Sequence, residues 1–152
     1  MSYPKEGELA PDFELSADDG TRIRLSDLRD RKVVLYFYPK DDTPGCTAQA
    51  CDIRDHIAEF DTRGAAVFGI SPDDVESHVR FRNKFRLPFR LLADTDHQVA
   101  EQYGVWKHKS MFGVKYWGVE RTTFIIDEHG RIASVLPRVK PVEHTGRVLD
   151  LI

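Results

Sequence analysis

Short apolar runs alternate with amphipathic stretches along the chain, and this pattern predicts the secondary structure. Apolar runs bounded by turn residues predict buried strands over residues 33–38, 65–70, 89–92, 122–126 and 132–135. Nearer the N-terminus, residues 13–15 and 22–25 alternate apolar and polar side chains on either side of an Asp-Asp-Gly turn. Such an arrangement is typical of a small hairpin.

Apolar positions three and four residues apart predict helices between these strands. The expected helices cover residues 47–62, 72–85 and 96–103, and a last helix begins at Val142. Ser71 followed by Pro72 is typical of a cap and a first helical position. Strands that alternate with helices indicate the α/β class, with a mixed central β-sheet flanked by helices on both faces and an N-terminal hairpin. We expect one domain over residues 1–152.

The composition narrows the possible partners. The 152 residues carry a formal net charge of −3, with acidic and basic side chains interspersed. This balance argues against nucleic acid or a membrane surface as the main partner. The first residues are acidic and lack the apolar segment of a signal peptide, and no apolar run approaches the roughly 20 residues that span a bilayer. We therefore expect a cytoplasmic protein, in which two cysteines serve chemistry more often than a structural bridge.

Cys46 lies where the first apolar run gives way, through a polar turn, to a helix. Pro44 lacks an amide hydrogen and suits the first helical position, so Thr43 would cap the helix and Cys46 would be its third residue. A thiol there is near unpaired backbone N–H groups and the positive end of the helix dipole, and both favour the nucleophilic thiolate. Two interpretations remain open: a reactive thiol, or a small buried apolar residue.

The spacing between Cys46 and Cys51 separates the redox interpretations. A C-x-x-C pair would indicate thioredoxin-type exchange, but four residues separate these cysteines. Residues five apart on an intact helix have Cα atoms about 8.6 Å apart, given a rise of about 1.5 Å per residue and a radius of about 2.3 Å. A disulfide requires about 4.4 to 6.8 Å. Either the two never pair, or the first turns of the helix unwind.

Metal binding is the next use of cysteine to consider. Structural zinc needs four ligands, and the six histidines show no second paired spacing that would complete a site. We therefore expect no metal.

Arg121 is the other residue that could take part in chemistry. It opens the apolar run 122–126, and a guanidinium at the end of a strand can hydrogen-bond a thiolate and a developing negative oxygen. The alternative is a surface arginine paired with its neighbour Glu120.

Together these residues resemble the peroxiredoxins, most closely the peroxiredoxin Q or bacterioferritin comigratory protein branch. The family signature Pro-x-x-x-Thr-x-x-Cys matches Pro39, Thr43 and Cys46. The longer form Thr-Pro-Gly-Cys-Thr-x-x-Ala-Cys continues to Cys51, and the family's active-site arginine falls on Arg121. The resemblance extends in family order over roughly residues 5 to 140.

The resemblance implies a thioredoxin-like fold and reduction of hydrogen peroxide or alkyl hydroperoxides. It implies that Cys46 is the peroxidatic cysteine, that Cys51 resolves it in the same chain, and that a thioredoxin-like protein reduces the disulfide. Thr43 would orient the peroxide, and Pro39 would wall the pocket. No metal, haem or flavin cofactor is implied, and we expect a monomer. Gln49 stands where glutamate is also common, and we expect little consequence.

Two rival functions belong to other classes. A thiol–disulfide oxidoreductase could use the same fold, although the four-residue spacing argues against it. A binding or holdase protein of the thioredoxin fold could carry incidental cysteines. Slow, unselective labelling of Cys46 at neutral pH would favour that second rival.

Overall fold

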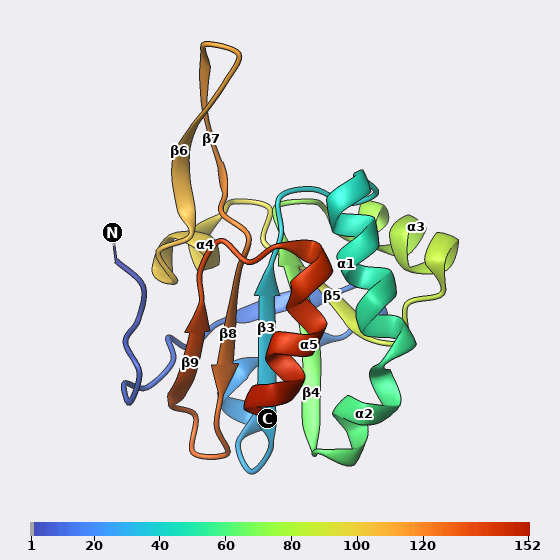
Figure 1. Cartoon of the computed structure of the whole chain (residues 1–152), viewed down its shortest axis with the longest axis vertical. Helices are drawn as coiled ribbons and strands as arrows, with labels where there is room; N and C mark the ends of the chain where they lie inside the picture. The colour runs from blue at the N-terminus through green and yellow to red at the C-terminus, as the bar shows by residue number, and fades with distance from the viewer. Residues whose placement is uncertain (1) are drawn as a thin grey trace.

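The computed structural model describes residues 2–152 and is built around a central mixed sheet (Figure 1). The strands follow the order β2-β1-β5-β4-β3-β8-β9 across the sheet. β3, β4 and β5 run parallel, and the other neighbours pair antiparallel. The bounds are β1 Glu14–Ala17, β2 Arg22–Arg24, β3 Lys32–Phe37, β4 Ala65–Ser71, β5 Arg90–Ala93, β8 Thr122–Ile126 and β9 Ile132–Leu136. The predicted α/β class, mixed sheet and N-terminal hairpin are confirmed.

Helices cover both faces of this sheet, because its strand residues alternate between two apolar clusters. Along β3, Val33, Leu35 and Phe37 join one cluster, and Val34 and Tyr36 join the other. α1, α2, α3 and α5 pack on the Tyr36 side, and α4 packs on the opposite side. The helices are α1 Pro44–Asp55, α2 Ile57–Thr62, α3 Val75–Phe85, α4 Gln98–Gln102, α5 Pro141–Leu151 and the 3-10 helix η1 Leu25–Leu28. Within residues 2–152, no helix is both long and apolar enough to span a bilayer.

The single helix predicted over residues 47–62 is wrong, because the structure has two helices separated at His56. The ring Nδ1 of His56 lies 2.8 Å from the carbonyl oxygen of Asp52, which a continuous helix would offer to the His56 amide. The amide donates instead to the carbonyl of Ile53, at 3.1 Å. The side chain therefore competes with the backbone for its acceptor and ends α1.

The predicted start of the next helix at Pro72 is also wrong, since α3 begins at Val75. Asp74 caps it, and its carboxylate accepts the amide of Ser77 at 2.8 Å. Ser71 is the last residue of β4, and its hydroxyl donates to Asp73 at 2.6 Å. Ser71, Asp73 and Asp74 can each cap a helix, and the sequence does not show which of them caps this one.

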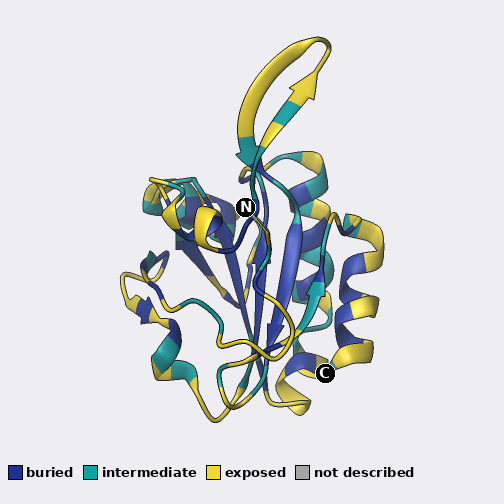
Figure 2. Ribbon diagram, turned by 90° about the vertical axis from the view of Figure 1, so that its left-hand side faces the viewer, coloured by how far each residue is buried: buried dark blue, intermediate teal, exposed yellow. Residues whose placement is uncertain are grey.

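A hairpin of β6 Trp106–Met111 and β7 Val114–Val119 projects from the body of the molecule (Figures 1 and 2). Its turn residues Phe112 and Gly113 both have positive φ, at 51° and 80°, as a two-residue type I′ hairpin turn requires. Phe112 is 99% exposed and Trp117 is 59% exposed. No pattern in the sequence predicts this hairpin, because its apolar side chains beyond the base, from Met111 to Trp117, are exposed rather than alternating toward a core.

His144 shows how closely α5 is packed against the sheet. Its side chain is fully buried, and its Nε2 lies 2.7 Å from the Thr123 hydroxyl on β8. Burial, together with the positive charges of Arg121 and Arg147, lowers the pKa of His144 to about 3. The imidazole is therefore neutral in the folded protein at neutral pH.

This neutral histidine should make stability depend on pH. The unfolded chain, with a histidine pKa near 6.5, binds a proton that the folded state excludes, so stability present above pH 6.5 is lost as the pH falls toward 3. We expect His144 to remove about 2 kcal/mol of unfolding free energy between pH 7 and pH 5. Urea denaturation of the wild type and His144→Gln at both pH values isolates this contribution. An identical pH dependence in the two proteins would contradict it.

Candidate active site

Cys46 lies in the first turn of α1, directly after the loop that leaves β3. Thr43 is the N-cap residue in extended conformation, Pro44 is the first helical residue, and Cys46 is 2% exposed. The predicted position in the helix is therefore confirmed. The Thr43 hydroxyl donates to the carbonyl of Lys40 at 2.9 Å and does not cap the helix with its side chain. It retains lone pairs that can accept a hydrogen bond from a ligand.

Arg121 reaches Cys46 across 75 residues of sequence because β3 and β8 are neighbours. Phe37, the last residue of β3, pairs with Thr122, so Arg121 lies at the same end of the sheet as the start of α1. Its Nη2 donates to the Cys46 sulfur at 3.3 Å. The alternative pairing with Glu120 is wrong, because the described side-chain contacts of Glu120 are with the hydroxyl groups of Tyr3 and Thr122.

Two further residues of α1, Gly45 and Gln49, determine the position of the Arg121 guanidinium. Gln49 is fully buried, and its Oε1 accepts a hydrogen bond from Nη1 of Arg121 at 2.5 Å. A Cβ atom on Gly45 would meet Arg121 Nη2 at 3.2 Å, closer than an ordinary contact. From the sequence alone, we expected little consequence of Gln49. Its spacing of three residues from Cys46 places both on one face of the helix, and that spacing is the signal that could have identified it.

Pro39 precedes Cys46 in the sequence, and Cys51 follows Gln49. Both cysteines are free thiols, and Cys51 is partly buried. α1 runs unbroken from Pro44 to Asp55 and so contains both sulfur atoms. This is the intact helix in which the two Cα atoms are too far apart for a disulfide. Pro39 is half-buried in the loop after β3.

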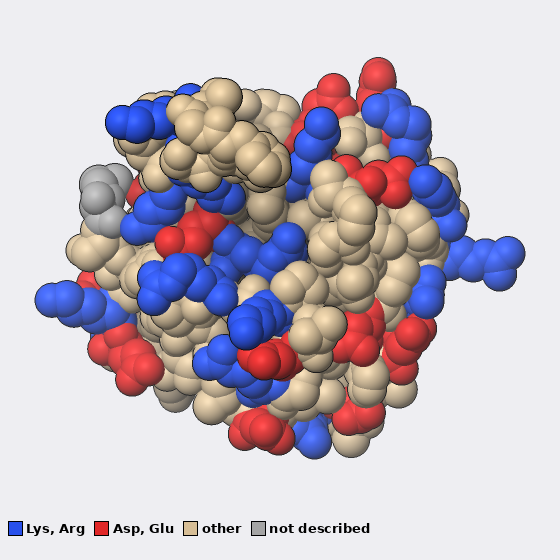
Figure 3. Space-filling model, turned by 45° about the horizontal axis from the view of Figure 1, so that its top comes forward, with Lys and Arg blue, Asp and Glu red and all other residues tan. Residues whose placement is uncertain are grey.

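The surroundings of the thiol are basic. Lys109, from the projecting hairpin, is half-buried and donates to the carbonyl of Val119. Burial lowers the pKa of Lys109, and the charge of Arg121 acts in the same direction. Lys and Arg side chains gather on the face of the molecule beneath the hairpin (Figure 3). Positive charge of this kind stabilises a thiolate and the oxygen that leaves from a peroxide.

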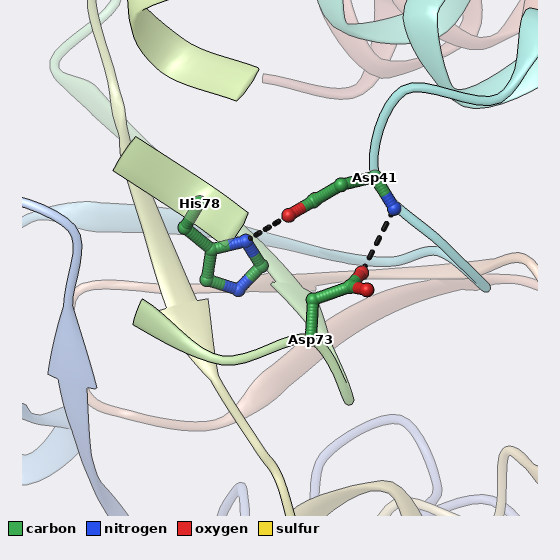
Figure 4. Close-up of side chains that lie close together, drawn as sticks. All are labelled: Asp41, Asp73 and His78. Carbon is green, nitrogen blue, oxygen red and sulfur yellow. Dashed lines mark hydrogen bonds and ion pairs between the residues drawn. The ribbon is translucent and has the colours of Figure 1, made fainter. Parts of the chain in front are cut away.

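A second polar cluster lies beside the loop between β3 and α1. One ligand-type atom from each of Asp41, Asp73 and His78 lies within 4.8 Å of the others (Figure 4). Nδ1 of His78 is 2.7 Å from Oδ2 of Asp41, and the amide of Asp41 donates to Asp73 at 2.8 Å. These hydrogen bonds account for the close approach without an ion.

The chain is similar to known proteins over most of its length. The model of the AhpC/TSA family matches residues 7–135. Peroxiredoxin Bcp of Bacillus subtilis is 47% identical over 144 residues, which cover 95% of this chain and 92% of that protein.

Two solved structures extend the comparison. A cysteine variant of peroxiredoxin Q from Xylella fastidiosa superimposes with a TM-score of 0.92 at 33% identity, covering 99% of this chain and 96% of that one. The bacterioferritin comigratory protein of Xanthomonas campestris, whose structure is described in terms of alkyl peroxide reduction, gives a TM-score of 0.89 at 34% identity over 99% and 96% of the two chains. Because these similarities extend over nearly the whole chain, the protein belongs to the AhpC/TSA family and, within it, to the thioredoxin-fold peroxiredoxins of the Bcp and peroxiredoxin Q type.

Proposed function

We propose that this peroxiredoxin reduces hydrogen peroxide and alkyl hydroperoxides with Cys46 as the peroxidatic thiol and Cys51 as the resolving thiol of the same chain. The observation that carries the proposal is the hydrogen bond from Arg121 Nη2 to the Cys46 sulfur at 3.3 Å. An arginine cannot lose its proton at any ordinary pH, so this donor favours a thiolate. A thiolate in the first turn of a helix, with its pocket walled by Pro39, is a suitable nucleophile.

The first step is oxidation of the sulfur. The Cys46 thiolate attacks one peroxide oxygen, the O–O bond breaks, and the sulfur becomes a sulfenic acid. The other oxygen takes up a proton and leaves as water or an alcohol. Arg121 stabilises the negative charge that develops on that oxygen, and the Thr43 hydroxyl orients the peroxide by hydrogen bonding.

The second step closes a disulfide. The Cys51 thiol attacks the sulfenic sulfur, the S–S bond forms, and water leaves. Since the intact α1 holds the two Cα atoms about 8.6 Å apart, its first turns must unwind for this step. Both thiols belong to one chain, so a monomer is sufficient. A thioredoxin-like dithiol protein then reduces the disulfide and is itself oxidised, as suits a compartment such as the cytoplasm that keeps thiols reduced.

Replacing each cysteine separately tests these roles. Cys46→Ser should abolish peroxide turnover, because a serine hydroxyl is not ionised near pH 7. Cys51→Ser should retain the first oxidation but lose recycling by thioredoxin. A dimedone-type probe, detected by mass spectrometry, should then label Cys46 only in Cys51→Ser. Equal loss of the first oxidation step in both variants would overturn the assignment.

Arg121→Lys tests the part played by the guanidinium. Lysine keeps the charge but lacks the planar fork that reaches the sulfur and Gln49 together. We expect the second-order rate constant with hydrogen peroxide to fall tenfold to a thousandfold, or by about 1.4 to 4 kcal/mol of barrier. Stopped-flow measurement gives this constant directly, and Arg131→Lys, at the exposed residue just before β9, is the matched control. A rate equal to that of the control would assign Arg121 a purely structural role.

A further inference from the structure

The loop that carries Cys46 toward Arg121 is held by one buried carboxylate. Six residues, 38–43, connect β3 to α1, and within them Lys40 and Asp42 are exposed whereas Asp41 is only 7% exposed. The mechanism described above gives Asp41 no chemical task. A buried carboxylate must nevertheless have partners that offset the loss of hydration.

Asp41 has hydrogen-bond partners in its own loop, in α3 and in the loop between β4 and α3. In the same loop, the Tyr38 hydroxyl donates to Oδ1 of Asp41 at 2.6 Å. On α3, the Ser77 hydroxyl donates to its Oδ2 at 2.8 Å, and His78 Nδ1 lies 2.7 Å from the same oxygen. Its own amide donates at 2.8 Å to Asp73, in the loop between β4 and α3. We call Tyr38, Asp41, Asp73, Ser77 and His78 the Asp41 cluster.

His78 is fixed by contacts on both sides of its ring. The ring is fully buried, with the Asp41 carboxylate at Nδ1 and the carbonyl oxygen of Leu92 on β5 3.0 Å from Nε2. The ring is therefore held at both of its nitrogens, by Asp41 on one side and by β5 on the other. Burial raises the pKa of Tyr38 well above its usual range, which keeps its hydroxyl a donor to Asp41.

We propose that Asp41 and His78 are positioning residues of the peroxidase reaction, because they fix the point from which α1 unwinds and refolds. Disulfide formation requires the segment from Thr43 to about residue 53 to lose its helix, and the packing of that segment is lost with it. Asp41 lies immediately before this segment, and its contacts are all with groups outside it. After reduction, the helix re-forms from an anchored start, so that Cys46 returns to Arg121.

This inference rests on the proposed roles of Cys46 and Cys51 and makes a distinct kinetic prediction. Oxidation of Cys46 depends on peroxide concentration and needs Cys46 correctly placed beside Arg121. Disulfide formation is independent of peroxide concentration and needs the helix to open. Weakening the contacts of Asp41 should therefore slow the oxidation of Cys46 and leave disulfide formation unchanged or faster. A general loss of stability is not expected to affect the two steps differently.

The variants to compare are Asp41→Asn, His78→Gln and the double variant. Asp41→Asn keeps the shape of the side chain but replaces one of its two hydrogen-bonded oxygens by an NH2 group, which cannot accept. We expect stopped-flow oxidation by hydrogen peroxide to slow about tenfold in each single variant. The double variant should lose little more, because residues that act as one unit are not additive. The first-order disulfide step should stay within twofold of the wild type or accelerate.

The matched control is Asp18→Asn. Asp18 is a carboxylate buried to a similar degree, paired with Arg82 at 3.2 Å and accepting the amide of Leu91 at 3.0 Å, and it belongs to the N-terminal hairpin. This variant should lower the melting temperature without changing the oxidation rate. Should Asp41→Asn not fold, Ser77→Ala removes one donor to the same carboxylate and should give a smaller loss in the same direction.

Amide exchange supplies the second measurement. In the wild type, the amide of Asp41 should remain protected in both the reduced and the disulfide form, while residues 44–53 exchange faster after oxidation. His78→Gln should lose the protection at Asp41. The proposal is overturned if oxidation rates in Asp41→Asn and His78→Gln equal that of Asp18→Asn, or if oxidised wild type loses protection at Asp41. A wild type that does not react with peroxide would refute the proposed function instead.

Discussion

The hydrogen bond from Arg121 to the Cys46 sulfur is the contact on which the site depends. It joins a strand to a helix that are far apart in sequence, and it requires both to be placed to within a fraction of an ångström. The pairing of β3 with β8 fixes Arg121, because its neighbour Thr122 is held opposite Phe37. The absent side chain of Gly45 and the amide oxygen of Gln49 then fix the guanidinium plane against α1.

With Cys51 as the proposed resolving thiol, the same helix must also come apart. An unbroken α1 presents the thiol to the peroxide, but it holds Cys46 and Cys51 too far apart to form a bond. A helix that opens during each cycle has to be of modest local stability. Among residues 2–152, the buried atoms Tyr36 Oη, Gln49 Nε2 and His144 Nδ1 have no hydrogen-bond partner within the protein. An unpaired buried polar group costs about 1–3 kcal/mol. Gln49 belongs to α1 itself, so its unpaired Nε2 reduces the stability of the packed helix.

The well-ordered loop before α1 compensates for the modest stability of this helix. The Asp41 cluster ties the loop before α1 to α3 and, through His78, to β5, by groups that stay outside the unwinding segment. A buried hydrogen bond adds little net stability, but removing one partner leaves the other unsatisfied at a larger cost, so these contacts fix geometry more than they add free energy. The helix can therefore be labile while its starting point is rigid.

The sequence by itself determined the strands, the α/β class and the helical position of Cys46. These follow from local regularities: apolar periodicity, the fixed φ of Pro44 and the spacing of the cysteines. It did not determine where α1 and α3 end or begin, since His56, Ser71 and Asp74 each offer a competing local hydrogen bond and only the packed structure selects among them. Nor did it show the hairpin of β6 and β7, whose side chains are not sorted by burial. Only the tertiary structure brought Arg121, Gln49 and Cys46 together and placed His78 against Asp41, because contacts between distant segments depend on strand order and register, which no local pattern encodes.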